Sequence, residues 1–206
     1  FYVDSFIYAV FIFFLMHKNK FTKRAQKEGL RSRSAYKLDE INKRFKIIKH
    51  GDGVLDLGCW PGGWMITAKK ITQKGYVLGV DKKEIEPVGG CDFLLADVMK
   101  EDILDKIKGR IAVVDVVLSD LAPNTTGIRE LDIGRSKDLC LRALFIAIAL
   151  LRVNGNFLCK LFQGEDSGEV IHSIKKCFHQ IKIYKPSASK KRSREVYIIA
   201  KGYKGL

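Results

Sequence analysis

The sequence of 206 residues has no cysteine or histidine pattern typical of a metal site. Its five cysteines and four histidines are scattered, with no C-x-x-C and no cysteine–histidine spacing of the kind that binds zinc. An odd number of unpatterned cysteines also excludes a disulfide framework and is typical of a reducing compartment inside the cell. We therefore predict no metal ion and no structural disulfide.

The chain also lacks an apolar run long enough for a stable membrane span. The apolar run 6–16 is well short of the roughly 20 residues that a spanning helix needs, and the mostly apolar stretch 138–151 is interrupted by Arg142. Basic residues follow the first run, whereas a secretory signal peptide carries them before its apolar core. We predict an apolar N-terminal extension over 1–17 and a catalytic domain over 18–206.

Acidic residues are fewer than basic ones. The 37 lysines and arginines exceed the 23 aspartates and glutamates, so the formal net charge is +14. Such an excess favours a polyanionic partner, usually nucleic acid, although an anionic membrane surface or a basic surface without a dedicated partner would look the same. The basic residues gather in the segments 18–33 and 185–194.

No internal repeat and no linker divides the chain, whose length suits one α/β domain. Apolar strand-like runs alternate with helical segments, which predicts a mostly parallel sheet with helices on both faces. The last two strands are close enough in sequence to form a hairpin, so one strand is expected to be antiparallel. The first helix is predicted with Ser32 or Ser34 as its N-cap. The other predicted elements are strands over 54–57, 76–80, 93–96, 113–119, 156–162, 181–184 and 196–200, and helices over 64–71, 102–108, 138–151 and 167–178.

The stretch VLDLGCWPGGW at 54–64 combines a buried strand, a glycine-rich turn and a helix start. Ligands bind at the carboxyl ends of strands in such sheets, and glycine permits turns with unusual dihedral angles. The absence of G-x-G-x-x-G argues against a dinucleotide. Asp81 and Asp97 follow two further strands, where nucleoside-binding folds place carboxylates against ribose hydroxyls. Ordinary roles, a ligand-free turn and two capping aspartates, remain the alternatives.

Lys160 stands within an apolar strand, where a lysine is unfavourable unless it is paired or functional. Its alternative role is a lysine whose ammonium reaches the solvent at the edge of the sheet.

Five motifs of this sequence together resemble the FtsJ/RrmJ ribose 2′-O-methyltransferases. They are RSRSAYKL at 31–38, LDLG at 55–58 with PGGW at 61–64, SDLAPN at 119–124, KLFQG at 160–164 and SREVY at 193–197.

The resemblance implies the Rossmann-like fold of methyltransferases dependent on S-adenosylmethionine (SAM), with seven strands, and a catalytic tetrad of Lys37, Asp120, Lys160 and Glu195. A ribose 2′-hydroxyl must lose its proton as the oxygen attacks the methyl group. Lys160 is the expected general base, which requires a neutral amine, and burial and a neighbouring cation favour that form. Lys37 would stabilise the developing alkoxide, and the two acids would orient the lysines and the hydroxyl.

The resemblance also implies which residues bind the cofactor and the RNA. Asp81 would bind the ribose hydroxyls of SAM, Asp97 its adenine amino group, and Asp120 would lie beside its methionine end. This chain departs from the family at Cys59 and Trp60, where the family usually has two small residues. The remaining expected cofactor residues are Gly58, Pro61, Gly62, Gly63 and Trp64, and the expected RNA-binding residues are Lys23, Arg24, Arg31, Arg33, Lys190, Lys191, Arg192 and Arg194.

Asn124 and the residues after it resemble the branch that acts on large-subunit ribosomal RNA, and they are most similar to its mitochondrial members. We therefore expect a monomeric enzyme that methylates a ribose, that of a uridine in the peptidyl-transferase region, with a mitochondrial location favoured over the cytoplasm. The alternatives are a tRNA 2′-O-methyltransferase and a non-catalytic RNA-binding factor of ribosome assembly. An intact tetrad favours the enzyme over the assembly factor.

Overall fold

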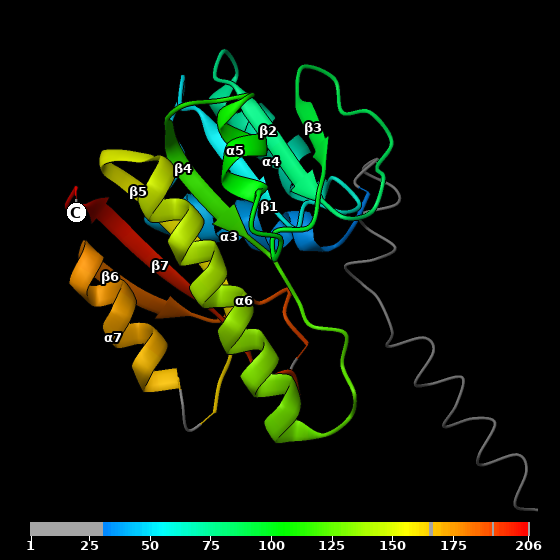
Figure 1. Cartoon of the computed structure of the whole chain (residues 1–206), viewed down its shortest axis with the longest axis vertical. Coiled ribbons are helices and arrows are strands. Elements are labelled where there is room, and N and C mark those ends of the chain that lie inside the picture. Colours follow the sequence, from blue (N-terminus) through cyan, green and yellow to red (C-terminus); the bar gives the residue numbers. More distant parts are fainter. Residues whose placement is uncertain (1–30, 165–166, 191, 206) are drawn as a thin grey trace, which may run out of the picture.

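The computed structural model describes residues 31–164, 167–190 and 192–205, and these form a seven-stranded sheet flanked by helices (Figure 1). The strand order is β3-β2-β1-β4-β5-β7-β6. This confirms the predicted mixed α/β sheet. The strands are β1 (Val54–Leu57), β2 (Val77–Asp81), β3 (Asp92–Leu95), β4 (Val114–Ser119), β5 (Leu151–Phe162), β6 (Phe178–Tyr184) and β7 (Glu195–Tyr203).

The antiparallel strand is β7. It lies between β5 and β6 and is antiparallel to both, whereas the pairs from β3 to β5 are all parallel. The predicted hairpin of the last two strands is therefore present. Insertion of β7 next to β5 sets Glu195 opposite Phe162 and Tyr197 opposite Lys160. Residues of β5 and β7 that are far apart in sequence thus become neighbours in the sheet.

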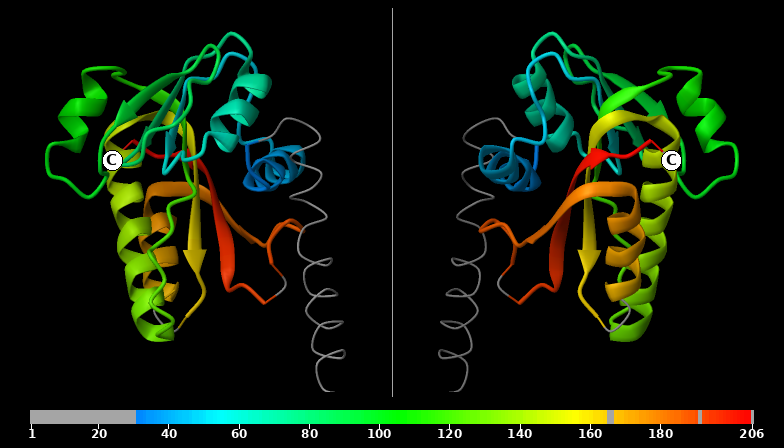
Figure 2. Two further views of the ribbon diagram at one scale, coloured as in Figure 1. Left: turned by 90° about the vertical axis from the view of Figure 1, so that its right-hand side faces the viewer. Right: turned by 90° about the vertical axis from the view of Figure 1, so that its left-hand side faces the viewer.

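Helices cover both faces of the sheet, as Figure 2 shows with the sheet seen nearly edge-on. One core lies under α3 and α4 and includes Leu38, Ile41 and Met65. The other lies under α5, α6 and α7 and includes Ile107 and Ile146. The helices are α3 (Ser34–Phe45), α4 (Gly63–Thr72), α5 (Ile103–Lys108), α6 (Arg129–Leu150) and α7 (Ser167–Cys177).

Helix α6 begins at Arg129, nine residues before the predicted start at Asp138. Its first turns are mostly exposed and polar, so the apolar periodicity that marks a packed helix is missing there. Glu130 and Asp132 in the first turn favour the helix N-terminus through the helix dipole. At its other end α6 stops at Leu150, one residue before the predicted end at 151, and β5 begins at once at Leu151, five residues before the predicted start of that strand.

The predicted capping of α3 was wrong as well. Arg33 occupies the N-cap position without a side-chain capping bond, and Ser34 is already the first helical residue. The hydroxyls of Ser32 and Ser34 lie 2.5 Å apart and hydrogen-bond to each other, so neither caps the helix.

Within the described residues no helix is both long and apolar enough to cross a membrane. The predicted N-terminal extension over 1–17 lies outside the described residues, as do Lys23, Arg24 and Lys191.

Asn42 fixes the loop that leads from α3 to β1. Its buried amide donates to the carbonyl of Ile48 at 3.2 Å and accepts from the Ile48 amide at 2.8 Å. Asn42→Ala should lower the free energy of unfolding by about 2 kcal/mol, because it leaves two buried backbone groups unpaired. Chemical denaturation measures the difference. The neighbouring exposed change Lys43→Ala should alter it by less than about 0.5 kcal/mol, and equal losses in both variants would contradict the role of Asn42.

Candidate active site

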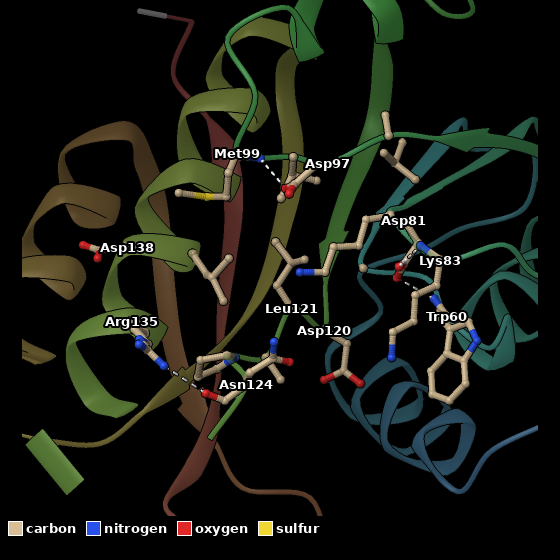
Figure 3. Close-up of a pocket in the computed structure, with 18 residues that line it drawn as sticks. Trp60, Asp81, Lys83, Asp97, Met99, Asp120, Leu121, Asn124, Arg135 and Asp138 are labelled. Atoms are coloured by element: carbon tan, nitrogen blue, oxygen red, sulfur yellow. Dashed lines mark hydrogen bonds between the residues drawn. The ribbon is translucent and has the colours of Figure 1, made fainter. Parts of the chain in front are cut away.

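A cavity of about 640 Å³ opens at the carboxyl edge of the parallel strands (Figure 3). Among the residues expected to bind a cofactor, Gly58, Asp81, Asp97 and Asp120 line it. Pro61, Gly62, Gly63 and Trp64 do not. The other lining residues are Trp60, Val80, Lys82, Lys83, Ala96, Val98, Met99, Leu121, Ala122, Pro123, Asn124, Arg135, Asp138 and Leu139.

The glycines of the turn permit close contact with other parts of the protein. Gly58 has φ 76° and Gly62 has φ 101°, both in the left-handed region that favours glycine. A Cβ on Gly58 would lie 2.7 Å from Leu121, and one on Gly63 would lie 2.5 Å from the Ser32 hydroxyl. The turn is thus packed against the loop after β4 and against the start of α3.

Trp64 joins the turn to α3 instead of lining the cavity. Its indole is buried and donates to the carbonyl of Ser34 at 2.8 Å. Since Ser34 begins the helix that carries Lys37, Trp64 helps to set the position of that lysine.

The two predicted nucleoside acids are held by backbone amides. Asp81 accepts from the amides of Trp60 at 3.0 Å and Lys83 at 2.9 Å, and Asp97 accepts from the amide of Met99 at 2.9 Å. Both residues line the cavity, and each carboxylate keeps lone pairs that can accept further hydroxyl or amino hydrogens. This arrangement fits the donor groups of an adenosine-containing cofactor.

The four predicted tetrad residues converge at the carboxyl end of β4 and β5. Lys160 donates to the Asp120 carboxylate at 3.0 Å and to the Asp120 carbonyl at 2.6 Å. Lys37 lies 2.5 Å from Glu195 as an ion pair. The side chains of both lysines are only 6% exposed, so these charges are separated from bulk water.

Tyr197 connects the two pairs and was missed by the sequence analysis. Its hydroxyl accepts from Lys37 at 3.1 Å and donates to the Asp120 carboxylate at 2.7 Å. The alternation of side chains along a strand was the available signal, because Glu195 and Tyr197 must share one face of β7. Only the pairing of β7 with β5 brings that face to Lys160.

The charges of the network determine which groups are ionised. Burial raises the pKa of Asp120, but the positive charges of Lys160 and Lys37 and the hydrogen bonds from Tyr197 and Lys160 outweigh it, so this pKa lies below its usual value. Burial also raises the pKa of Glu195, and Lys37 brings it below its usual value. Burial and the two carboxylates raise the pKa of Tyr197 well above normal, so its hydroxyl stays protonated.

Comparisons with known proteins bear on what this site does. The model of the family described as FtsJ-like methyltransferase matches residues 30–203. The chain belongs to this family. The cavity and the two paired lysines lie where the sequence motifs predict the active site of a methyltransferase.

Two curated relatives of this methyltransferase carry the name ribosomal RNA large subunit methyltransferase E. The protein of Methanothrix thermoacetophila is 44% identical over 185 residues, covering 89% of this chain and 72% of its own. The protein of Desulfatibacillum aliphaticivorans is 42% identical over 193 residues, with coverage of 91% and 92%. A ribosomal RNA methyltransferase structure from Plasmodium falciparum superposes with a TM-score of 0.77 at 26% identity, covering 85% of this chain and all of that one.

The predicted RNA-binding residues are differently placed in this methyltransferase. Arg31 is engaged within the protein, since its guanidinium donates to the carbonyls of Pro61 at 3.4 Å, Glu86 at 2.5 Å and Pro87 at 2.7 Å. It thus ties the start of α3 to the glycine-rich turn and to the segment after β2. Lys190, Arg192 and Arg194 are exposed on the loop between β6 and β7, and Arg33 is half-buried.

Glu40 holds this β6–β7 loop against α3. Its carboxylate accepts from the backbone amide and the hydroxyl of Ser187 and from the hydroxyl of Tyr184. These bonds hold the first residues of the loop that leads into β7, and Glu195 is the first residue of that strand.

Asp56 is a second residue that the sequence analysis did not assign. It lies in β1 beneath the cavity, fully buried, and neither carboxylate oxygen has a hydrogen-bond partner among the described residues. Burial, together with the negative charges of Asp120 and Asp81, raises the pKa of Asp56 well above its usual value. The raised pKa favours the protonated form of Asp56, which adds no further negative charge beside those two acids.

This raised pKa predicts a pH-dependent stability. Above about pH 4 the unfolded chain releases the Asp56 proton while the folded chain retains it, so rising pH lowers the free energy of unfolding by up to about 1.4 kcal/mol per pH unit until the folded-state pKa is reached. Asp56→Asn should remove this contribution. Denaturation curves from pH 4 to 8 measure it, and the exposed change Asp39→Asn is the control. Parallel pH profiles for wild type and Asp56→Asn would show that Asp56 is charged.

Proposed function

We propose that this methyltransferase transfers a methyl group from SAM to the ribose 2′-oxygen of a uridine in large-subunit ribosomal RNA. The observation that carries the proposal is the network of Lys37, Asp120, Lys160 and Glu195 at one end of a cavity that also holds Asp81 and Asp97. The two curated relatives, named as methyltransferases of the large-subunit RNA, support the choice of substrate.

The cavity residues would hold SAM by the groups that they already orient. Asp81 would accept the ribose hydroxyls, Asp97 the adenine amino group, and Gly58 with Asp120 would adjoin the methionine end. The volume of about 640 Å³ lies within the range of small-molecule and cofactor sites. When bound, SAM supplies an electrophilic methyl group carried by a sulfonium.

Lys160 would act as the general base for the 2′-hydroxyl. A neutral lysine amine has two hydrogens and one lone pair, and Lys160 makes two hydrogen bonds to Asp120, through its carbonyl and its carboxylate. As general base the amine would have released the proton that it carries in the ion pair with Asp120; with both remaining hydrogens used in this way, the lone pair would accept the hydroxyl proton. Asp120 therefore orients the amine for its task.

Lys37 would provide the fixed positive charge. Its ion pair with Glu195 and its hydrogen bond to Tyr197 hold the ammonium in place without removing its charge. A preorganised cation in a water-poor site stabilises negative charge that develops on the attacking oxygen. Alignment of two bound reactants adds a further large part of the rate enhancement.

The RNA would approach across the basic β6–β7 loop. Lys190, Arg192 and Arg194 are exposed on this loop, which runs directly into Glu195. Exposed cations beside the reacting groups suit contacts with the phosphates of a folded RNA, and such binding weakens as salt rises. Lys23, Arg24 and Lys191, outside the described residues, remain further proposed contacts.

Methyl transfer from labelled SAM tests the proposal. Undermethylated large ribosomal subunits, small subunits and tRNA are offered separately, and the modified nucleotide is mapped. Label on the ribose of a large-subunit uridine is the expected result. Label on tRNA alone would exclude the ribosomal assignment. No label on any RNA, with no thermal stabilisation by SAM, would instead support a non-catalytic RNA-binding factor.

Lys160→Met should reduce the rate of transfer by about 10²- to 10⁴-fold, because general base catalysis contributes an effect of that size. SAM affinity, measured by calorimetry, should stay within about twofold of wild type. Methionine keeps most of the buried volume, and Lys182→Ala on the exposed face of β6 is the control, expected to keep full activity. Full turnover in Lys160→Met would remove Lys160 as the base.

A further inference from the structure

Trp60 is a large aromatic residue at the rim of the active-site cavity that is not buried in the core. Its side chain is 52% exposed, although it lines the same cavity as Asp120 and Asp81. A single exposed aromatic residue is common on protein surfaces and by itself indicates nothing. Here a cation accompanies it, because the ammonium of Lys83 lies 4.7 Å from the centre of the Trp60 ring.

The backbone around Trp60 is held on both sides. Its amide donates to Asp81 at 3.0 Å, the amide of Gly62 donates to the carbonyl of Cys59 at 2.6 Å, and the carbonyl of Pro61 accepts from Arg31 at 3.4 Å. Cys59, the other unusual residue of the turn, is buried. The ring is therefore presented from a fixed backbone, which lowers the entropic cost of placing a flat ligand against it.

We infer that Trp60, with Lys83 over one face of its ring, offers the opposite face as a stacking platform for a nucleobase next to the ribose that is methylated. An indole face accepts any base, with a favourable stacking contribution, and a lysine beside it suits the adjoining phosphate. This inference rests on the proposed RNA substrate. It adds a contact with the base to the contacts with phosphates proposed for the β6–β7 loop.

The position of the ring favours RNA over the cofactor as its occupant. Figure 3 shows Trp60 beside Lys83 and Asp81 and level with Asp120, whereas Met99 and Asp97, next to the proposed adenine, lie farther away. Asp120 is bonded to Lys160, the proposed base, so the target ribose must arrive beside Asp120. The formal charge of +14 matches a polyanion as the incoming ligand.

Tryptophan fluorescence tests the platform without any methyl transfer. Trp60 and Trp64 are the two tryptophans of the chain, and Trp64 is 2% exposed. Titration with an RNA oligonucleotide in the absence of SAM should quench wild type, because a stacked base quenches an exposed indole. The Trp60→Phe variant, which retains only Trp64, should show little quenching. Equal quenching of the two proteins, or none in wild type, would overturn the inference.

Steady-state kinetics with large ribosomal subunits provides the second readout. Trp60→Ala should raise the KM for RNA by about 5- to 150-fold, the effect of losing one stacked base, with the KM for SAM within about twofold of wild type. Trp60→Phe should recover most of the loss. The matched control is Phe145→Ala on α6, because Phe145 is 50% exposed and also has a cation over its ring, with the guanidinium carbon of Arg142 5.1 Å from the ring centre. This control should leave both KM values unchanged.

The outcomes separate this inference from the proposed function. Quenching of Trp60 by RNA without methylation of large subunits would retain the platform and refute the substrate. Methylation with an unchanged KM for RNA in Trp60→Ala would refute the platform and retain the substrate. A raised KM for SAM alone would assign Trp60 to the cofactor site and so overturn the inference.

Discussion

The rest of the site depends on the two hydrogen bonds that Lys160 and Tyr197 donate to the carboxylate of Asp120. This carboxylate stands at the end of β4, where it accepts from Lys160 and from Tyr197, and Tyr197 in turn accepts from Lys37. Two buried lysines would repel each other and would be costly to remove from water without counter-charges. Asp120 and Glu195 supply these charges, so the two lysines can be held close to one position for a substrate hydroxyl.

The glycine-rich turn connects this network to the cavity. Its small residues let the turn pack against α3, while the indole of Trp64 bonds to the first residue of that helix. Arg31 adds bonds to the turn and to the segment after β2. Lys37 therefore owes its position to the same turn that carries Gly58, one of the residues proposed to hold the cofactor. A change in the turn would be expected to disturb both.

Charge is distributed unevenly over the protein. The cavity is lined by four carboxylates together with Lys82, Lys83 and Arg135, whereas the described part of the β6–β7 loop carries exposed cations and no acid. This distribution suits two different ligands. Carboxylates bind the hydroxyl and amino groups of a nucleoside, and cations bind phosphates.

The order of strands and helices, the glycine-rich turn and the acids at the strand ends could be predicted from the sequence, because strand periodicity and local motifs carry this information, and the resemblance to a known family singled out Lys37, Asp120, Lys160 and Glu195. The sequence could not place the start of α6, whose exposed first turns have no apolar periodicity, and it missed Tyr197 and Asp56. Their roles depend on which strands are neighbours. Only the tertiary structure decided that β7 inserts beside β5, that Arg31 bonds within the protein and that Trp60 faces solvent, since contacts between distant segments are not encoded in any local pattern.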